Sequence, residues 1–185
     1  MKSKNKIILH DDYAEVVLYN KYKEEIGRAI IDLEDVDKIK NYKWHIAEGY
    51  ANNKSTGKMH RFIIDCPKGM VVDHINGNTL DNRKCNLRIC TIAENSRNRN
   101  KYKKNASSIY KGVSYDKKKG KWRAIIQINK KSKHIGYYDS ELEASIQYDK
   151  KAILYHGVYA KTNHSIENYY DYIMELGLDV DDFIS

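Results

Sequence analysis

The stretch between residues 70 and 95 constrains the fold more than any other part of this sequence. The apolar run at 70–74, which ends in Asp-His, follows a Pro-Lys-Gly break and is typical of a short strand. An Asn-Gly-Asn turn signal occupies 76–78, and residues 86–90 can return as a second strand. Residues 91–94 read Thr-Ile-Ala-Glu, which is the spacing of a helix capping box. We therefore expect a strand, a long turn, a second strand and a helix in that order.

Polar residues along this pattern suit the hydrolysis of a phosphodiester, which needs a base to activate water and a Lewis acid on the phosphate. Asp73 offers a hard oxygen ligand beside the imidazole of His74. Neighbours on a strand point to opposite faces, so these two converge only if the strand ends or twists there, as the following turn suggests. Asn95, in the first turn of the expected helix, offers a neutral oxygen ligand suited to Mg²⁺ or Mn²⁺. Asn86 can tie down the long turn through hydrogen bonds to the backbone.

A family resemblance rests on short pieces of sequence in a fixed order: Met59-His60-Arg61, residues 72–78, Asp81-Asn82-Arg83, Asn86-Leu87-Arg88 and residues 94–98. Together they resemble the HNH endonucleases, specifically the phage and intron-type homing enzymes whose last motif residue is Asn. The resemblance implies a ββα-metal site with one divalent cation, Mg²⁺ or Mn²⁺. It assigns Asp73 and Asn95 as metal ligands, His74 as general base and Asn86 as the residue that positions the loop. Arg61, Arg97 and Arg99 are expected to bind DNA, Arg61 through a phosphate, and His60 is expected in a structural role.

An isolated Asp-His pair is more often a turn hydrogen bond than an active site. The joint placement of all these pieces, with the capping box aligned, favours the active site here.

A concentrated positive charge follows this pattern. Residues 95–135 hold fourteen Lys and Arg against the single acid Asp116, so this window carries +13, whereas the whole chain carries +8. Such a block is the electrostatic footprint of a nucleic-acid binder. A solvated linker is the alternative, but apolar residues such as Trp122 and Ile126 are interleaved with the charges, and a linker has no use for them. The block predicts a folded basic surface.

Three strand-like runs, at 110–114, 121–129 and 133–138, precede a helix expected at 141–155. Ser140 is placed to cap the start of this helix, and Gly157 lies just past its end. Strand alternation on the middle run puts the apolar side chains on one face, to meet the helix: Trp122, Ala124, Ile126 and Ile128. The other face then carries Arg123 and Gln127.

This region resembles the plant ethylene-response-factor (APETALA-type) DNA-binding domain over residues 109–163. The resemblance rests on 109–115, 121–125, 134–139, Glu143-Ala144, Tyr148-Asp149, Ala152 and 157–163. It implies a three-stranded antiparallel sheet lying in the major groove of double-stranded DNA, with the helix packed behind. Arg123 and Gln127 have the donors and acceptors that read base edges. Phosphate contacts are expected from Lys111, Ser114, Lys121, Lys133 and His134, as well as from Lys117 and Lys131. The sheet has fewer arginines than the plant pattern, which predicts weaker or different base readout.

The remaining segments complete an α+β fold class, with a ββα-metal nuclease module followed by the three-stranded sheet and helix. In the N-terminal part we expect a hairpin at 7–20, a strand at 29–33, a helix at 33–40 and two strands at 44–46 and 49–51. The expected layout is a nuclease module at 1–100, a basic linker at 101–108, a DNA-binding domain at 109–164 and an acidic C-terminal helix at 165–185. This tail has six acids and no base, and it can pack on its own chain, pair with another chain or screen the basic surface.

Composition indicates the compartment. No stretch approaches the roughly 18 apolar residues of a membrane span, so no membrane partner is expected. No apolar run follows the charged N-terminus, so we expect no signal peptide. The three cysteines form no even-numbered disulfide framework, and their spacing does not fit structural zinc. We expect a cytoplasmic protein of a bacterial or phage-infected cell.

The leading hypothesis is a metal-dependent, site-preferring homing-type nuclease acting on double-stranded DNA, with a monomer as the simplest nickase and a dimer as the alternative. The second hypothesis is a non-catalytic, sequence-specific DNA-binding regulator. An RNA-binding protein is the third, because basic sheets with exposed aromatic residues also stack unpaired bases.

Overall fold

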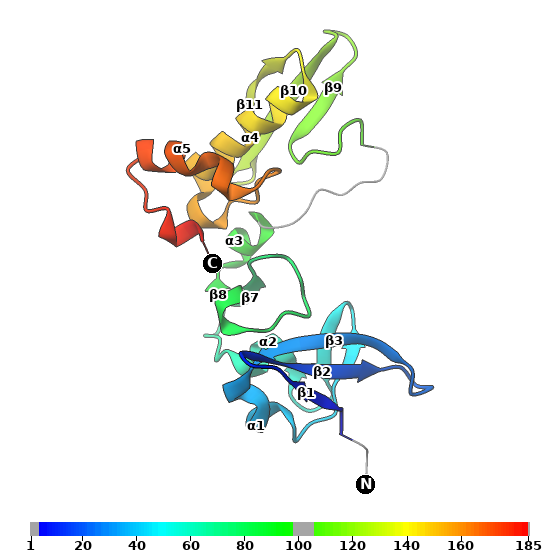
Figure 1. The fold of residues 1–185 in the computed structure, drawn as a ribbon. Coiled ribbons are helices and arrows are strands. Elements are labelled where there is room, and N and C mark those ends of the chain that lie inside the picture. The colour runs from blue at the N-terminus through cyan, green and yellow to red at the C-terminus, as the bar shows by residue number, and fades with distance from the viewer. Residues whose placement is uncertain (1–3, 98–105, 185) are drawn as a thin grey trace. The chain divides into compact units, whose positions relative to one another are not determined.

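The structure, a computed structural model, describes residues 4–97 and 106–184. It contains two compact units, Met1–Ile92 (unit 1) and Ala93–Ser185 (unit 2) (Figure 1). Both units mix helices and sheets, which confirms the expected class at this level. Within the described ranges, no helix is long and apolar enough to cross a bilayer.

Unit 1 begins with a three-stranded antiparallel sheet of β1 (Ile7–Leu9), β2 (Tyr13–Tyr19) and β3 (Glu25–Asp32). The predicted hairpin is confirmed, but β3 begins earlier than residue 29 because it pairs with β2 along its whole length, from Tyr13↔Asp32 to Tyr19↔Glu25. A 3-10 turn (Leu33–Asp35) and α1 (Val36–Ile39) make up the predicted helix.

A second small sheet follows, formed by β4 (His45–Ala47), β5 (Tyr50–Asn53) and β6 (Gly57–Lys58). Glu48 and Gly49 both have positive φ, which confirms the predicted turn between β4 and β5. β5 continues beyond the strand expected at 49–51, because it pairs with β6 through Asn52↔Lys58 and Asn53↔Gly57. The short helix α2 (Met59–Ile63) was not predicted and carries His60 and Arg61.

The pattern between 70 and 95 folds largely as expected. β7 (Val71–His74) pairs antiparallel with β8 (Leu87–Cys90), and α3 (Ile92–Arg97) follows. Asn86 lies in the 3-10 turn Lys84–Asn86 rather than in the strand. The long turn between β7 and β8 is attached to β3, since Ile30 donates to the Leu80 carbonyl (2.8 Å) and Asn82 donates to the Ile30 carbonyl (2.7 Å).

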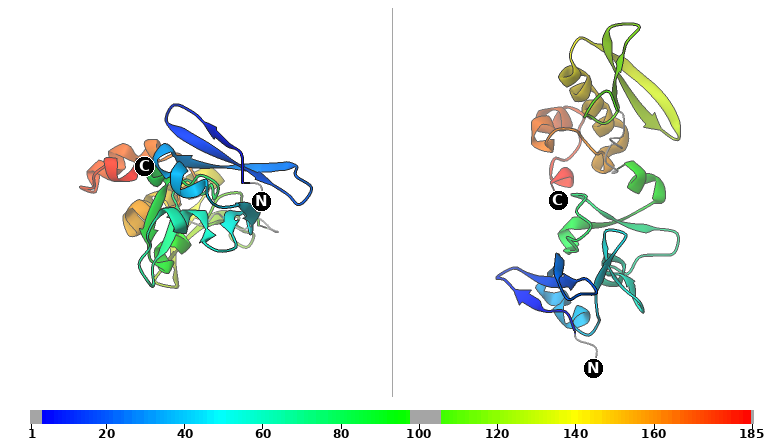
Figure 2. Two further views of the ribbon diagram at one scale, coloured as in Figure 1. Left: turned by 90° about the horizontal axis from the view of Figure 1, so that it is seen from below. Right: turned by 90° about the vertical axis from the view of Figure 1, so that its right-hand side faces the viewer.

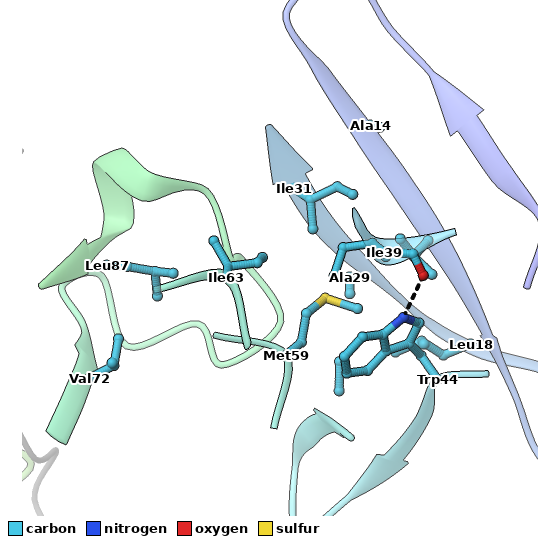
Figure 3. Close-up of a cluster of buried hydrophobic side chains, with 12 residues drawn as sticks. Ala14, Leu18, Ala29, Ile31, Ile39, Trp44, Met59, Ile63, Val72 and Leu87 are labelled. Carbon is cyan, nitrogen blue, oxygen red and sulfur yellow. Dashed lines mark hydrogen bonds between the residues drawn. The ribbon is translucent and has the colours of Figure 1, made fainter. Parts of the chain in front are cut away.

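One hydrophobic core joins the parts of unit 1. Figure 3 shows Trp44, Met59 and Ile39 side by side, with the Trp44 indole Nε1 donating to the Ile39 carbonyl at 3.1 Å. The same buried cluster extends from Ala14 and Leu18 of β2 to Val72 of β7 and Leu87 of β8. The hairpin that carries the candidate site therefore shares a core with the N-terminal sheet.

Unit 2 contains the sheet β9 (Val113–Asp116), β10 (Lys121–Ile128) and β11 (Lys131–Tyr138), in the order β11-β10-β9. All pairs are antiparallel, as predicted. β10 and β11 are joined by a tighter turn than expected, in which Asn129 and Lys130 both have positive φ. Ser107 and Ser108, assigned to the linker from sequence, hydrogen bond to Tyr115 and Tyr110 within this unit. Residues 101–105 of the expected linker lie outside the described residues.

The helix α4 (Glu141–His156) lies along one face of this sheet (Figures 1 and 2). The Ser140 hydroxyl accepts from the Glu143 amide at 3.0 Å, and Gly157 has φ +53, so both predicted helix ends are confirmed. Ala124 and Ile126 of β10 are buried beneath α4, as strand alternation predicted.

The acidic tail packs on its own chain. It forms 3-10 turns at Ile166–Tyr169 and Asp181–Phe183 around α5 (Tyr170–Glu175), after a 3-10 turn at Gly157–Tyr159, so it is not one continuous helix. Ile173 and Tyr169 are buried against Ile153 of α4. The buried Asp149 carboxylate accepts hydrogen bonds from the Tyr169 hydroxyl (2.9 Å) and the His164 amide (3.0 Å). Of the three possibilities left open by the sequence, packing within unit 2 is the one observed.

Gly112 is the residue at which unit 2 should be most sensitive to one added methyl group. It has φ +76, and a Cβ there would lie 2.1 Å from ring carbons of Tyr148 and 2.7 Å from the Ile125 carbonyl. We expect Gly112→Ala to destabilise unit 2 by about 3 kcal/mol or more, combining about 1–2 kcal/mol of left-handed backbone strain with about 1–3 kcal/mol of overpacking. Thermal unfolding measures this. Gly120→Ala is the matched control, because φ is +65 but the nearest atom is 3.9 Å away; equal losses would contradict the packing argument.

Candidate functional site

His74 lies at the end of β7 in a cluster of rings and amides contributed by three other segments. The His60 ring of α2 meets it edge-on, with centroids 4.8 Å apart, and the Tyr50 ring of β5 lies 6.0 Å away. The side-chain oxygen of Asn82, from the long turn, is 3.4 Å from His74 Nε2. His60, His74 and Asn82 are all buried.

Burial sets the charge of both imidazoles. It lowers the pKa of His74, with the hydrogen bond to Asn82 acting in the opposite direction. Burial, together with the nearby His74, lowers the pKa of His60 to about 3. Both rings are therefore neutral at physiological pH, and only a neutral imidazole can accept a proton from water.

The Asn82 side chain favours one tautomer of His74. Its Nδ2 donates to the Leu80 carbonyl at 2.9 Å, so its Oδ1 is the atom that faces the imidazole. An amide oxygen can only accept, so this contact is a hydrogen bond when the neutral His74 ring carries its proton on Nε2.

Asn86 spans the base of the long turn, as the sequence predicted. Its Oδ1 accepts from the Asn76 amide at 2.9 Å, and its Nδ2 donates to the Asp81 carbonyl at 2.8 Å. Asp81 in turn forms a two-pronged ion pair with Arg83, with both contacts at 2.8 Å. This ion pair lowers the pKa of the Asp81 carboxyl. Asn86 thus fixes the two ends of the turn that presents Asn82.

Asp73 directly precedes His74 on β7, and its charge acts to raise the pKa of His74, against the larger effect of burial. β7 pairs with β8 up to its last residue, which places Asp73 opposite Arg88 and His74 opposite Leu87. The buried Asp73 carboxylate receives Arg88 Nη2 at 2.9 Å and Nε at 3.2 Å, both on Oδ2, from the opposite position on β8.

The chemistry of Asp73 fits the predicted metal ligand, because it is a hard carboxylate oxygen held in place by two paired strands.

A second group of acidic side chains in unit 1 has a structural role. Among the described residues, Asp32, Glu34 and Asp35 bring three carboxylates together. Lys84 engages this group through ion pairs with Glu34 and Asp35 and through its amide to Asp32, so the group has a structural explanation.

The other residues predicted for the first module are placed as follows. Asn95 and Arg97 lie on α3, whose first residue ends unit 1, so the roles of both stay predictions. Arg99 lies outside the described residues. Arg61 is exposed on α2, beside a hollow of about 490 Å³ that Lys68 and Ile92 also line.

Several predicted DNA contacts share the face of the β9–β11 sheet opposite α4, here called the outer face. Arg123 pairs with Ser114 of β9 on one side and with Tyr137 of β11 on the other. Gln127 is exposed further along the same strand, and His134 is exposed with its ring 4.6 Å from that of Tyr137. Lys121 is also exposed and pairs with Asp139 at 2.9 Å.

Lys133 and Lys111 depart from this arrangement. A bulge in the β10–β11 pairing places His134 opposite Ile125 and Lys133 opposite Ile126, so Lys133 points to the helix side. Its ammonium donates to the Tyr155 hydroxyl of α4 at 2.8 Å. The Lys111 ammonium donates to the Arg97 carbonyl within unit 2, and burial lowers the pKa of Lys111 to about 8. The geometry disfavours phosphate contacts by these two side chains.

Sequence reasoning missed the side chains that surround His74. Asn82 lies in one of the matched pieces of sequence and Tyr50 in the strand expected at 49–51, but neither was given a role. His60 was expected to be structural, and its edge-on contact with His74 agrees with that role. For Asn82, the available signal was its position close to Asp73-His74 in the sequence. Tyr50 and His60 reach His74 from segments that are distant in the chain, so no local pattern marks their contacts.

Comparison with known proteins identifies a related segment. The HNH endonuclease family model matches residues 65–97. An uncharacterized HNH endonuclease of Acanthamoeba polyphaga mimivirus is 36% identical over 94 residues, covering 46% of this chain and 48% of the relative. A putative HNH homing endonuclease of the SPbeta prophage of Bacillus subtilis is 57% identical over 35 residues, covering 19% and 20%. The ethylene-responsive transcription factor WRI1 of Arabidopsis thaliana is 37% identical over 73 residues, covering 38% and 17%.

Residues 65–97 are thus similar to HNH endonucleases, and the partial matches support a nuclease function. The partial match to WRI1 only weakly suggests a DNA-binding domain of its type. The chain spans about half or less of the length of the curated relatives it matches. No solved structure matches it significantly.

The turn-spanning role of Asn86 predicts a loss of stability when its side chain is removed. Asn86→Ala deprives the Asn76 amide and the Asp81 carbonyl of their partners. We expect unit 1 to lose about 2–3 kcal/mol, since a buried polar group left unsatisfied costs about 1–3 kcal/mol. Urea unfolding gives the free energy, and hydrogen exchange should rise at Asn76. Asn78→Ala removes one exposed turn bond as a control and should cost about 0.5–1 kcal/mol; a similar loss in both variants would refute the role.

Proposed function

We propose that this protein is a metal-dependent endonuclease that hydrolyses phosphodiester bonds in double-stranded DNA, as a site-preferring homing-type nickase. The observation that carries the proposal is the neutral, buried His74, held by Asn82 in a turn that Asn86 spans. This arrangement lies within the segment that matches the HNH endonuclease family.

His74 is the proposed general base. Its Nδ1 accepts a proton from the water that attacks phosphorus, while Asn82 fixes the Nε2 proton and the ring orientation. Asn86 positions the turn, and Arg61, Arg97 and Arg99 hold phosphates.

Asp73 and Asn95 would hold one Mg²⁺ or Mn²⁺ in a ββα-metal arrangement with α3. The cation, when bound, supplies Lewis-acid polarisation of the scissile phosphate. Asp73 contributes a carboxylate that Arg88 already orients.

Unit 2 is the proposed DNA-binding module, with the outer face of its sheet in the major groove. Arg123 and Gln127 would read base edges, and Ser114, Lys121 and His134 would contact phosphates. The bulged register that brings His134 to the outer face supports this assignment. With one candidate site per chain, a monomer nicks one strand, in a bacterial or phage-infected cell.

A non-catalytic DNA-binding regulator is the second candidate, favoured by the partial match of unit 2 to a transcription factor. Both candidates bind duplex DNA, so cleavage separates them.

The cleavage test uses supercoiled plasmid with Mg²⁺, with Mn²⁺ and with EDTA. We expect wild type with metal to produce open circles, and His74→Ala to be slower by about 10²–10⁴-fold, the usual contribution of a general base. His10→Ala is the control, because it alters an exposed histidine of the same unit. DNA binding without cleavage by wild type, on plasmids carrying phage target sequences, would favour the regulator.

The outer face gives a second test, by fluorescence anisotropy with duplex DNA. Arg123→Ala should weaken specific binding by about 1–3 kcal/mol, as expected for loss of a base contact. Lys133→Ala removes a positive charge of the same strand pair on the helix side and should leave affinity nearly unchanged. A larger effect at Lys133 than at Arg123 would mean that the sheet binds DNA through its other face.

A further inference from the structure

A second hollow of unit 1 lies outside the HNH segment. Its volume is about 710 Å³, within the roughly 300–1,000 Å³ of small-ligand sites. Four segments line it: the N-terminal Lys4, the end of β2 with the following turn (19–21), the segment before and into β4 (41–45) and the β5–β6 turn (53–55). All are distant in sequence from residues 65–97.

The charge of this hollow has one sign. Lys4, Lys21, Lys43 and Lys54 line it, and no acidic residue does. All four lysines are exposed, and none of them forms an ion pair with another described residue. Four positive charges around a concavity attract anions, and among the described residues the one acid whose carboxylate reaches a lining residue is Glu24, which accepts from Asn20 Nδ2 at 2.7 Å.

The backbone that presents these lysines is already ordered by hydrogen bonds. Asn53, which is buried, donates from Nδ2 to the Lys43 carbonyl at 2.8 Å and accepts from the Ser55 amide at 2.9 Å. Asn20 accepts from the Tyr22 and Glu24 amides in the turn that carries Lys21. Binding therefore has to order only the lysine side chains.

The walls also offer aromatic surface. Tyr19 and Tyr42 are half-buried lining residues. Tyr42 is fixed by edge-on contacts with Phe62 (centroids 5.0 Å apart) and Trp44 (6.2 Å). Positive charge around tyrosine rings suits a ligand that combines phosphate with a sugar or base.

We propose that this hollow, here called the lysine pocket, binds the phosphodiester backbone of DNA and extends the contact surface of the nuclease beyond the HNH segment and unit 2. The proposal rests on the proposed function for the identity of the nucleic acid. A free nucleotide carries the same phosphate chemistry, so the experiment has to separate the two sources.

The test compares Lys43→Ala/Lys54→Ala with Lys38→Ala/Lys40→Ala in the full chain, in EDTA, by anisotropy with duplex DNA over a range of salt. Lys38 lies on α1 and Lys40 directly follows it; both are exposed and neither lines the pocket, so both variants lose the same formal charge. We expect the pocket variant to bind all sequences more weakly and its salt slope to become shallower by about 2, or about 1 per lost phosphate contact. The control should keep the wild-type slope. Equal changes in affinity and salt slope in both variants would mean that net charge alone causes the effect, and would overturn the proposal.

The source of the phosphate is separated by amide chemical shifts of the wild type in EDTA. Duplex DNA should shift Lys43 and Lys54. Shifts there with a mononucleotide or polyglutamate, but not with duplex, would overturn the DNA assignment. Because binding is measured without metal, the lysine pocket can be confirmed even if plasmid nicking fails. Conversely, if the wild type nicks plasmid but the pocket variant binds DNA as the wild type does, the lysine pocket is refuted and the proposed function is not.

Discussion

The hydrogen bonds that hold the long turn between β7 and β8 are the constraint on which the candidate site depends. β7 and β8 are short, and a short hairpin with a long connection is marginal by itself because closing and ordering the loop costs conformational entropy. Asn86 joins the two ends of the turn, and Ile30 of β3 pairs with its middle. The turn thereby becomes a rigid part of unit 1 and presents Asn82 to His74.

The hydrophobic core transmits this support across unit 1. The cluster around Trp44 and Met59 reaches Val72 and Leu87, so the hairpin cannot shift without disturbing the N-terminal sheet. The same packing buries His60 and His74, and this burial lowers the pKa of each imidazole. The packing that holds the hairpin and its turn in place therefore also keeps His74 neutral, which is the state that general-base chemistry needs.

In unit 2, the two faces of one sheet differ in what they present. The inner face packs on α4 through Ala124 and Ile126, and the acidic tail closes the other side of α4 through Ile173. Asp149 connects these layers by accepting hydrogen bonds from the segments that follow the helix. The outer face exposes polar and basic side chains, whereas the acidic tail packs its apolar side chains into the core of the unit.

Local patterns in the sequence were sufficient for the elements whose signals are short-range. Alternation, caps and turn residues predicted the first hairpin, the β7–β8 pair, and α4 between Ser140 and Gly157. They also predicted that Asn86 would tie the turn to itself, because its partners are near in sequence. Only the tertiary structure decided which rings and amides surround His74, since His60 and Tyr50 come from other elements. It also decided that Lys133 faces α4, because one bulged residue reverses every later side chain of a strand, and strand alternation carries no signal for it.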